Sequence, residues 1–421
     1  MNPLLLSGFG ISINVDKRKL IINNKIKNQR LEFYPHKINH DGIVIDGHYG
    51  NVSFEAMRWL AKHNISLSLL HWNGKLLSVT LPDTPMSGRL RVTQYLKYLD
   101  NDFRFKVATD IINNKINNSL NIIKNLSRFY NVLNVKSFKK AIDKEENHYK
   151  TSLTYNKSTL TYNKSTFTNK NSLKFLKTLM TFEGRIALLY WSELGKVFKT
   201  LCPAFNFKAR KSRESSRNYN ASDEVNALLN YGYSILETEV RKAINSVGLD
   251  PSIGFLHEIS QSRTPLVYDI QELFRWIVDL SVIQVLEQNS IKKSDFIITE
   301  NYHTRLKENT ASLLIDAIRF NFGLKMPYKT GKNYYYSVIL EDNVKQLANH
   351  IMCKSKNFKF TVPDIVLPRK DVLELREKIL SMTPEQRKQL GINKSTLWYL
   401  KNNLKDNKSF KIYDKVLTKI Q

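Results

Sequence analysis

Gly254-Phe255-Leu256-His257 and, after a short loop, Leu266-Val267-Tyr268-Asp269-Ile270-Gln271-Glu272-Leu273-Phe274-Arg275 form the most informative stretch of the chain. The apolar residues of the second segment recur with the spacing of a buried helix face. Asp269 and Glu272 stand three residues apart, so they would share one face of that helix. His257 precedes a loop that contains Pro265, so a turn can fold the imidazole back toward the two carboxylates. The stretch therefore predicts a helical core that carries a polar cluster.

This polar cluster has the composition of a metal site. Carboxylates and an imidazole are ligands for divalent ions that act on phosphate groups. The alternative interpretation is an ordinary solvated helix face with His257 as a surface or capping residue. The apolar neighbours of Asp269 and Glu272 favour the metal site, because carboxylates in such surroundings need a cation or a proton to offset their desolvation.

The charge balance of the chain is strongly basic. The 65 lysines and arginines exceed the 38 aspartates and glutamates by 27. Such an excess favours a polyanionic partner, and we expect that partner to be nucleic acid. Basic residues cluster around Arg210, Arg213 and Arg217, and these arginines, with Arg275, are candidates for positioning DNA phosphates. A purely structural role is the alternative for each of them.

Other features of the composition indicate where the protein acts. The sequence contains no run of eighteen or more apolar residues, so we expect no membrane anchor. Cys202 and Cys353 are far apart and match no zinc-binding spacing. The sequence thus predicts a reduced, cytoplasmic protein associated with DNA.

Residues 1–85 are predicted to form a β-rich domain. Short β-prone runs are separated there by Asn, Asp and Gly. One helix is expected to interrupt them, with Ser53 as its N-cap and its end near Asn64. Trp72-Asn73-Gly74-Lys75 predicts a turn between strands. The predicted strands are Ile11–Val15, Lys19–Ile22, Gly42–Ile45 and Ser66–Leu70.

Residues 89–350 show helical periodicity and predict an all-helical domain, after a linker at 82–88. One segment within it differs in composition. The heptad Leu-Thr-Tyr-Asn-Lys-Ser-Thr at 153–159 is duplicated at 160–166 and then decays. We expect 153–172 to be an exposed low-complexity loop.

Residues 354–421 predict a small helical DNA-binding region. With a β-rich domain followed by helical regions, the whole chain is predicted to belong to the α+β class. Thr383-Pro384-Glu385-Gln386 is a capping box, and Gly391 ends the helix that it starts. A second, polar and basic helix follows, as in a helix-turn-helix. Its first residues, Asn393, Lys394 and Ser395, are the candidates for contacting bases. A plain helical hairpin is the alternative.

Four long, ordered motifs are spread over residues 1 to roughly 340. They are Tyr49-Gly50-Asn51-Val52-Ser53, Thr181-Phe182-Glu183-Gly184-Arg185, Val225 to Tyr233, and Gly248 to His257 with the segment from Tyr268 to Asp279. Together they resemble the Cas-one integrases associated with CRISPR. The resemblance implies an N-terminal β-domain through which two copies form a homodimer, and an all-helical catalytic domain.

The resemblance also implies the chemistry. It places divalent-metal ligands at Glu183, His257 and Glu272, with Asp269 as a further catalytic residue, and Mn²⁺ or Mg²⁺ as the cofactor. The implied reaction is nicking of double-stranded DNA and transfer of a 3′-hydroxyl end into a target strand. At the position of Glu272 the family often has aspartate, and glutamate is one methylene longer but can still reach a metal.

Three functions are compatible with these features. A C-terminal helix-turn-helix lies outside the usual core of CRISPR adaptation integrases and resembles casposases, which join the ends of a mobile element to target DNA. The second possibility is a CRISPR adaptation integrase that inserts spacers together with a partner protein. The third is a non-catalytic architectural DNA-binding protein, which the intact set of acidic residues and histidine disfavours.

Overall fold

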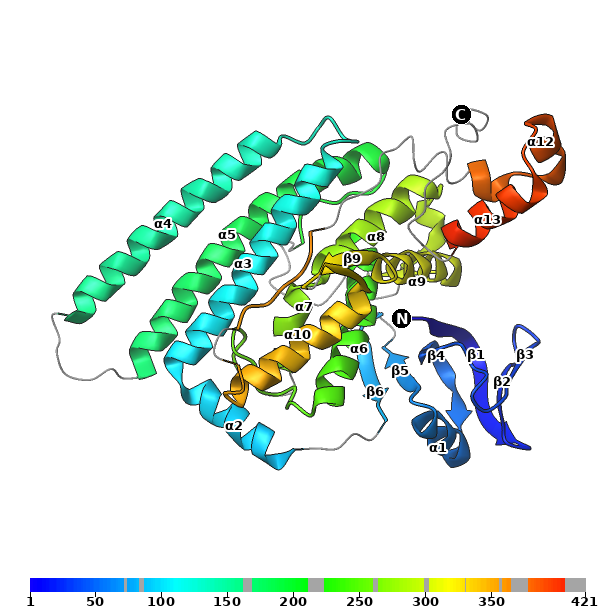
Figure 1. Ribbon diagram of the computed structural model, residues 1–421, viewed down its shortest axis with the longest axis horizontal. Coiled ribbons are helices and arrows are strands. Elements are labelled where there is room, and N and C mark those ends of the chain that lie inside the picture. The colour runs from blue at the N-terminus through cyan, green and yellow to red at the C-terminus, as the bar shows by residue number, and fades with distance from the viewer. Residues whose placement is uncertain are drawn as a thin grey trace.

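The computed structural model combines a β-sheet, a large helical body and a small C-terminal helical unit (Figure 1). The predicted α+β class is confirmed. None of the helices in the described part of the chain is long and apolar enough to cross a membrane. The structure describes residues 1–71, 74–82, 87–161, 169–210, 223–259, 264–298, 303–329, 331–355, 358–364 and 378–405.

The N-terminal unit is a six-stranded sheet with the strand order β3-β2-β1-β4-β5-β6. β1 pairs in parallel with β4 and β4 with β5, whereas the other neighbours are antiparallel. All four predicted strands are confirmed as parts of β1, β2, β4 and β5. β3 was not predicted, and β6 was implied only by the turn predicted before it; both are largely exposed edge strands. The strands are β1 (Pro3–Asp16), β2 (Lys19–Asn24), β3 (Gln29–Phe33), β4 (Gly42–Val52), β5 (Ser66–Leu70) and β6 (Leu76–Thr80).

The predicted helix between these strands is α1 (Phe54–Lys62). Ser53 caps it as expected, since its hydroxyl oxygen accepts a hydrogen bond of 3.1 Å from the backbone N–H of Ala56. α1 buries Trp59 and Leu60 against the sheet. In the predicted turn between β5 and β6, Trp72 and Asn73 lie outside the described residues, and Gly74 has a positive φ of 77°.

The helical body is organised around α6 (Glu224–Val247), which contacts α7, α8, α9 and α10 as well as β5 and β6 of the sheet. The predicted helical character of this region is confirmed, and two small hairpins, β7–β8 and β9–β10, were not predicted. Its other helices are α2 (Gly88–Leu99), α3 (Asn101–Leu126), α4 (Val135–Thr161), α5 (Asn169–Leu201), α7 (Pro265–Glu272), α8 (Arg275–Gln288), α9 (Glu308–Phe322) and α10 (Tyr336–Ile351). The hairpin strands are β7 (Phe296–Ile298), β8 (Thr304–Leu306), β9 (Lys325–Tyr328) and β10 (Lys332–Tyr335), and a short 3₁₀ turn, η1 (Lys293–Asp295), precedes β7.

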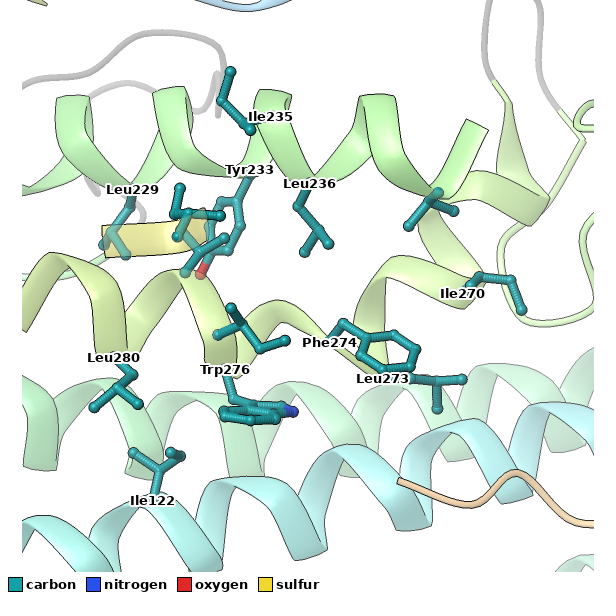
Figure 2. Close-up of a cluster of buried hydrophobic side chains, with 14 of the residues drawn as sticks. Ile122, Leu229, Tyr233, Ile235, Leu236, Ile270, Leu273, Phe274, Trp276 and Leu280 are labelled. Carbon is teal, nitrogen blue, oxygen red and sulfur yellow. The ribbon is translucent and has the colours of Figure 1, made fainter. Parts of the chain in front are cut away.

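The core between α6 and the α7–α8 pair is tightly packed. Figure 2 shows Leu229 and Leu236 of α6 facing Leu273, Phe274 and Trp276, with α3 beneath them. Gly232 lets α6 and α8 come close together. A Cβ atom at this position would lie 2.5 Å from Cγ1 of Val278, which is closer than real side chains approach.

The expected loop at 153–172 is wrong for most of its length. α4 continues through 161 and α5 begins at Asn169, so only 162–168 lie outside the described residues. Each seven-residue copy of the heptad is nearly two helical turns long, so its length is compatible with a helix despite its polar composition. The first copy, 153–159, extends a helix whose earlier turns bury Phe138 and Ile142, and tertiary packing of this kind overrides local propensity.

The helical body also ends later than the predicted boundary near 350. Phe360 is buried and its backbone N–H donates a hydrogen bond to Asp110 of α3. Asn343 of α10 binds the backbone of Thr361 in both directions, at 2.9 Å each. The segment around Phe360 and Thr361, which follows the basic run after α10, therefore belongs to the helical body.

The C-terminal unit contains α12 (Pro384–Gln389) and α13 (Lys394–Lys405). The Thr383–Gln386 capping box is present, with both reciprocal hydrogen bonds, and Gly391 has the expected positive φ of 58°. The two helices share a small core that is separate from the main one. It consists of Ile379, Met382, Ile392, Leu397 and Leu400, with Leu390 packed against it.

The close approach at Gly232 predicts a specific cost of substitution. We expect Gly232→Ala to lower the free energy of unfolding by about 1–3 kcal/mol, because the new methyl group overpacks the contact with Val278. Gly184→Ala in α5 is the control, since nothing lies within 4 Å of its added Cβ. The control should be neutral or gain up to about 1 kcal/mol in urea denaturation, and equal losses in both variants would contradict the packing argument.

Candidate active site

The candidate site begins where one helix is interrupted. α7 ends at Glu272 and α8 starts at Arg275, so the apolar pattern that predicted one continuous helix spans a break at Leu273 and Phe274. Both residues of the break are fully buried. The side-chain amide of Asn118 in α3 donates a 3.0 Å hydrogen bond to the carbonyl of Leu273. The backbone carbonyl that the break frees therefore keeps a hydrogen-bond partner, and Glu272 faces α3.

Asp269 organises the loop that carries the histidine. Its carboxylate is fully buried and accepts hydrogen bonds from the backbone N–H groups of Phe255, Leu256 and His257. Oδ1 also lies 2.7 Å from Nδ1 of the His257 ring. His257 folds back toward the helix as predicted, and its hydrogen bonds with Asp269 hold it there.

Gly254 leaves room for this arrangement. A Cβ atom there would lie 2.8 Å from Oδ2 of Asp269 and 2.7 Å from Cβ of Pro265. With Nδ1 of His257 held by Asp269, Nε2 is the ring nitrogen that can bind a ligand. Within the part of the chain that the structure describes, the hydrogen bonds of Asp269 are directed at this loop, so its position is that of a residue that orients His257.

Glu183 of α5 and Glu272 of α7 converge on a single cation, the ammonium of Lys115 in α3. Nζ of Lys115 lies 2.6 Å from Oε2 of Glu272 and also forms an ion pair with Oε1 of Glu183. Glu272 is 6% exposed, whereas the side chains of Glu183 and Lys115 are 23% and 24% exposed. Three helices that are distant in sequence thus bring two carboxylates to one point in the lining of a cleft.

The charges around Glu272 keep it ionised. Burial by itself raises the pKa of this carboxyl, but the cations Arg275 and Lys115 outweigh burial and lower the pKa to about 2. The Arg275 guanidinium donates a 2.9 Å hydrogen bond to Oε1 of Glu272. Burial likewise lowers the pKa of Lys115, and the two carboxylates reverse this and raise it. Glu272 is therefore an anion and Lys115 a cation at neutral pH.

The residues fit a divalent ion by their chemistry. Two carboxylates already converge on a positive charge, and an imidazole with one committed nitrogen lines the same cleft. Within the described ranges, however, no three carboxylate, imidazole or thiolate groups lie close enough together to form a ready-made metal site. Burial lowers the pKa of His257, but the hydrogen bond and negative charge of Asp269, together with the charge of Glu272, outweigh burial and leave the pKa raised.

A second polar cluster lies further along the cleft, and no role was predicted for its members. The hydroxyls of Tyr190 and Tyr233 both donate hydrogen bonds to the buried carboxylate of Asp279, the first at 2.9 Å. Burial raises the pKa of Asp279, and these hydrogen bonds offset the effect only in part. Arg275 stacks over the Tyr233 ring at 4.2 Å, which connects this cluster to Glu272.

The predicted DNA-contacting residues divide into three groups. Arg210 and Arg275 both line the cleft, whose volume is about 1250 Å³. Arg210 is held by Asn226 and Asn230 and lies over the Trp191 ring. Arg213 and Arg217 lie outside the described residues. A third group, Asn393, Lys394 and Ser395, is exposed in the C-terminal unit, at the start of α13.

Comparisons with known proteins agree on one family. The sequence family described as CRISPR associated protein Cas1 matches residues 4–319. The CRISPR-associated endonuclease Cas1 1 of Archaeoglobus fulgidus is 28% identical over 340 residues, which covers 80% of this chain and 92% of the relative. The CRISPR-associated protein Cas1 3 of Methanobrevibacter ruminantium is 29% identical over 296 residues, covering 69% of this chain and 80% of the relative.

The solved structures include a casposase bound to an integration product. The casposase superposes on this chain with a TM-score of 0.74 at 35% identity, and the match covers 90% of this chain and 99% of the casposase chain. A Cas1 protein from Thermotoga maritima has the same fold, with a TM-score of 0.63 at 18% identity over 86% of this chain and the whole of its own.

The role of Asp269 predicts a stability effect. Asp269→Asn replaces an acceptor of several hydrogen bonds with a side chain that must point an amide N–H₂ at donors. We expect the free energy of unfolding to fall by about 2 kcal/mol or more. Asp316→Asn, on an exposed stretch of α9, is the control and should change it by less than about 0.5 kcal/mol in the same urea titration. Equal stability of Asp269→Asn and the parent would show that the loop does not depend on this carboxylate.

Proposed function

The chain belongs to the Cas1 family, and from this premise we propose that it is a divalent-metal-dependent DNA integrase that joins a 3′-hydroxyl end to a target strand. The observation that carries the proposal is the convergence of Glu183 and Glu272 on one cation beside a histidine that Asp269 holds in place. Such a reaction exchanges one phosphodiester for another, so it requires no energy-rich cofactor.

The chain supplies the ligands and orients them. Glu183, His257 and Glu272 would hold Mn²⁺ or Mg²⁺ through two carboxylates and the free ring nitrogen. A bound divalent ion stabilises the charge that develops on phosphoryl, attacking and leaving oxygens. Asp269 is the positioning residue, because a carboxylate behind a ligating histidine fixes both the tautomer and the orientation of the ring.

The basic residues of the cleft are suited to holding the DNA backbone. Arg275 and Arg210 line the same cavity as the proposed ligands, and both stack against the Tyr233 ring. A guanidinium presents several donors in a fixed plane, which suits phosphate oxygens. We propose that Arg275 orients the phosphate nearest the metal and that Arg210 contacts the strand further along.

Within the family we propose the casposase branch. Two observations favour it: 35% identity to a casposase over 90% of the chain, and a capped helix-turn-helix with its own core after the catalytic region. The second candidate is a CRISPR adaptation integrase that acts with a partner protein, and the similarity to curated Cas1 endonucleases favours it. Terminal inverted repeats and a polymerase gene beside the coding sequence would support the first candidate. A repeat-spacer array would support the second.

The N-terminal sheet is the proposed dimer interface. Phe9, Tyr49 and Phe54 belong to this unit and are 54%, 75% and 80% exposed. We propose that a second copy of the chain covers these side chains, since apolar surface gathered in one patch marks a protein interface. A homodimer would place two clefts on one assembly, as is needed to join two DNA ends.

Loss of any proposed ligand should abolish joining. We expect Glu183→Ala, His257→Ala and Glu272→Ala each to reduce strand transfer of a labelled oligonucleotide in Mn²⁺ to the protein-free background, with DNA binding retained. Glu341→Ala, on the exposed side of α10, is the control and should join at the parental rate. Near-parental joining by the His257→Ala protein would overturn the assignment.

The C-terminal unit should supply sequence discrimination. We expect removal of residues 378–421 to leave joining on generic DNA and to lower the ratio of joining on cognate over scrambled ends. Alanine at Asn393, Lys394 or Ser395 should lower the same ratio, because the first residues of the second helix face base edges.

The matched control for this test is Lys388→Ala in α12, which removes an exposed charge outside α13. It should weaken binding to both sequences equally and leave the ratio unchanged. An unchanged ratio in the truncated protein would show that α12 and α13 form only a structural hairpin.

A further inference from the structure

Lys115 occupies the point at which the two acidic residues of the site meet. Its ammonium forms an ion pair with both Glu183 and Glu272, and the second distance is 2.6 Å. The lysine comes from α3, whereas the carboxylates come from α5 and α7. A single side chain from a third helix therefore neutralises the charge that a metal would use.

A divalent ion and this ammonium compete for the same oxygens. Ligand oxygens must lie about 2.0–2.6 Å from Mg²⁺ or Ca²⁺, so the ion would need the space that Nζ now fills. Lys115 is also able to leave. Its side chain is 24% exposed, lines the cleft and carries the ammonium on a flexible four-carbon stem.

The cleft offers a second anion for the ammonium when DNA is present. Lys115 lines the same cavity as Arg275 and Arg210, which under the proposed function receive the DNA backbone. A phosphate that enters next to Arg275 would come within reach of Lys115, because Arg275 itself binds the other oxygen of Glu272. The ammonium can then exchange a carboxylate partner for a phosphate partner without losing its charge.

We propose that Lys115 is a tethered competitor of the metal, and that a DNA phosphate draws its ammonium off Glu183 and Glu272 so that the site loads with metal when DNA is bound. This inference rests on the proposed function. By linkage, metal in turn strengthens DNA binding by the same factor. The device would keep the free protein largely unloaded and restrict the reaction to bound DNA.

The test measures Mn²⁺ binding rather than turnover. Mn²⁺ is titrated into the full-length protein and followed by isothermal calorimetry or by the electron paramagnetic resonance of free Mn²⁺. Lys115→Met keeps the length of the side chain and removes its charge. We expect it to bind Mn²⁺ roughly tenfold tighter than the parent in the absence of DNA, a factor typical of coupled sites.

Lys196→Met is the matched control. Lys196 lines the same cleft but forms an ion pair with Glu193 of its own helix. The Lys196→Met variant reports the general effect of removing one positive charge from the cleft. Because solvent and salt screen that charge, the variant should change Mn²⁺ affinity by less than about twofold. Equal tightening in both variants would overturn the inference, because it would show a general electrostatic effect.

A second arm compares Mn²⁺ binding with and without DNA, and its main comparison is within the parent protein. A short duplex oligonucleotide should tighten Mn²⁺ binding by the parent roughly tenfold and have little effect on Lys115→Met. The His257→Ala protein with the same duplex is the blank, since DNA itself binds Mn²⁺. Unchanged affinity of the parent with and without duplex would overturn the proposed coupling.

The two proposals fail in different ways. If the parent shows no Mn²⁺ site that depends on His257, with or without duplex, the proposed function is wrong and the inference falls with it. If a His257-dependent site exists but Lys115→Met binds Mn²⁺ no tighter than the parent, only the role of Lys115 is wrong.

Discussion

The buried carboxylate of Asp269 is the constraint on which the site depends. A carboxylate removed from water is costly unless donors surround it, and here the donors are three consecutive backbone N–H groups and one imidazole nitrogen. Satisfying that single group forces the loop from Gly254 to wrap over α7. The imidazole of His257 is held near Glu272 as a consequence of this folding requirement.

The helix break beside Asp269 completes the geometry. α7 stops at Glu272 because Leu273 and Phe274 are drawn into the core between α6 and α3, and Asn118 satisfies the freed backbone carbonyl. Glu272 thereby ends one helix while Arg275 starts the next, so an anion and a cation meet across the break. The apolar packing, more than the polar residues themselves, decides which way the carboxylate points.

Much of this could be predicted from the sequence, and the remainder has physical reasons for being hidden. The strands, the Ser53 and Thr383 caps and the His257 loop are local patterns, in which spacing and turn chemistry carry the information. Lys115 gave no such signal. It lies in an Asn- and Lys-rich helix, 68 residues from Glu183 in the sequence, and only the packing of α3 on α5 and α7 brings the charges together. The helical continuation of α4 was missed for the opposite reason, since a polar local composition was outweighed by distant contacts.

The separate core of the C-terminal unit has an evolutionary consequence. Its apolar residues form a cluster of their own, so substitutions that repack it leave the packing around α6 unchanged. Selection can therefore alter the surface of α13 at one pace and preserve the cleft of the candidate site at another. A lineage could acquire, lose or exchange this unit as a module while inheriting the same chemistry.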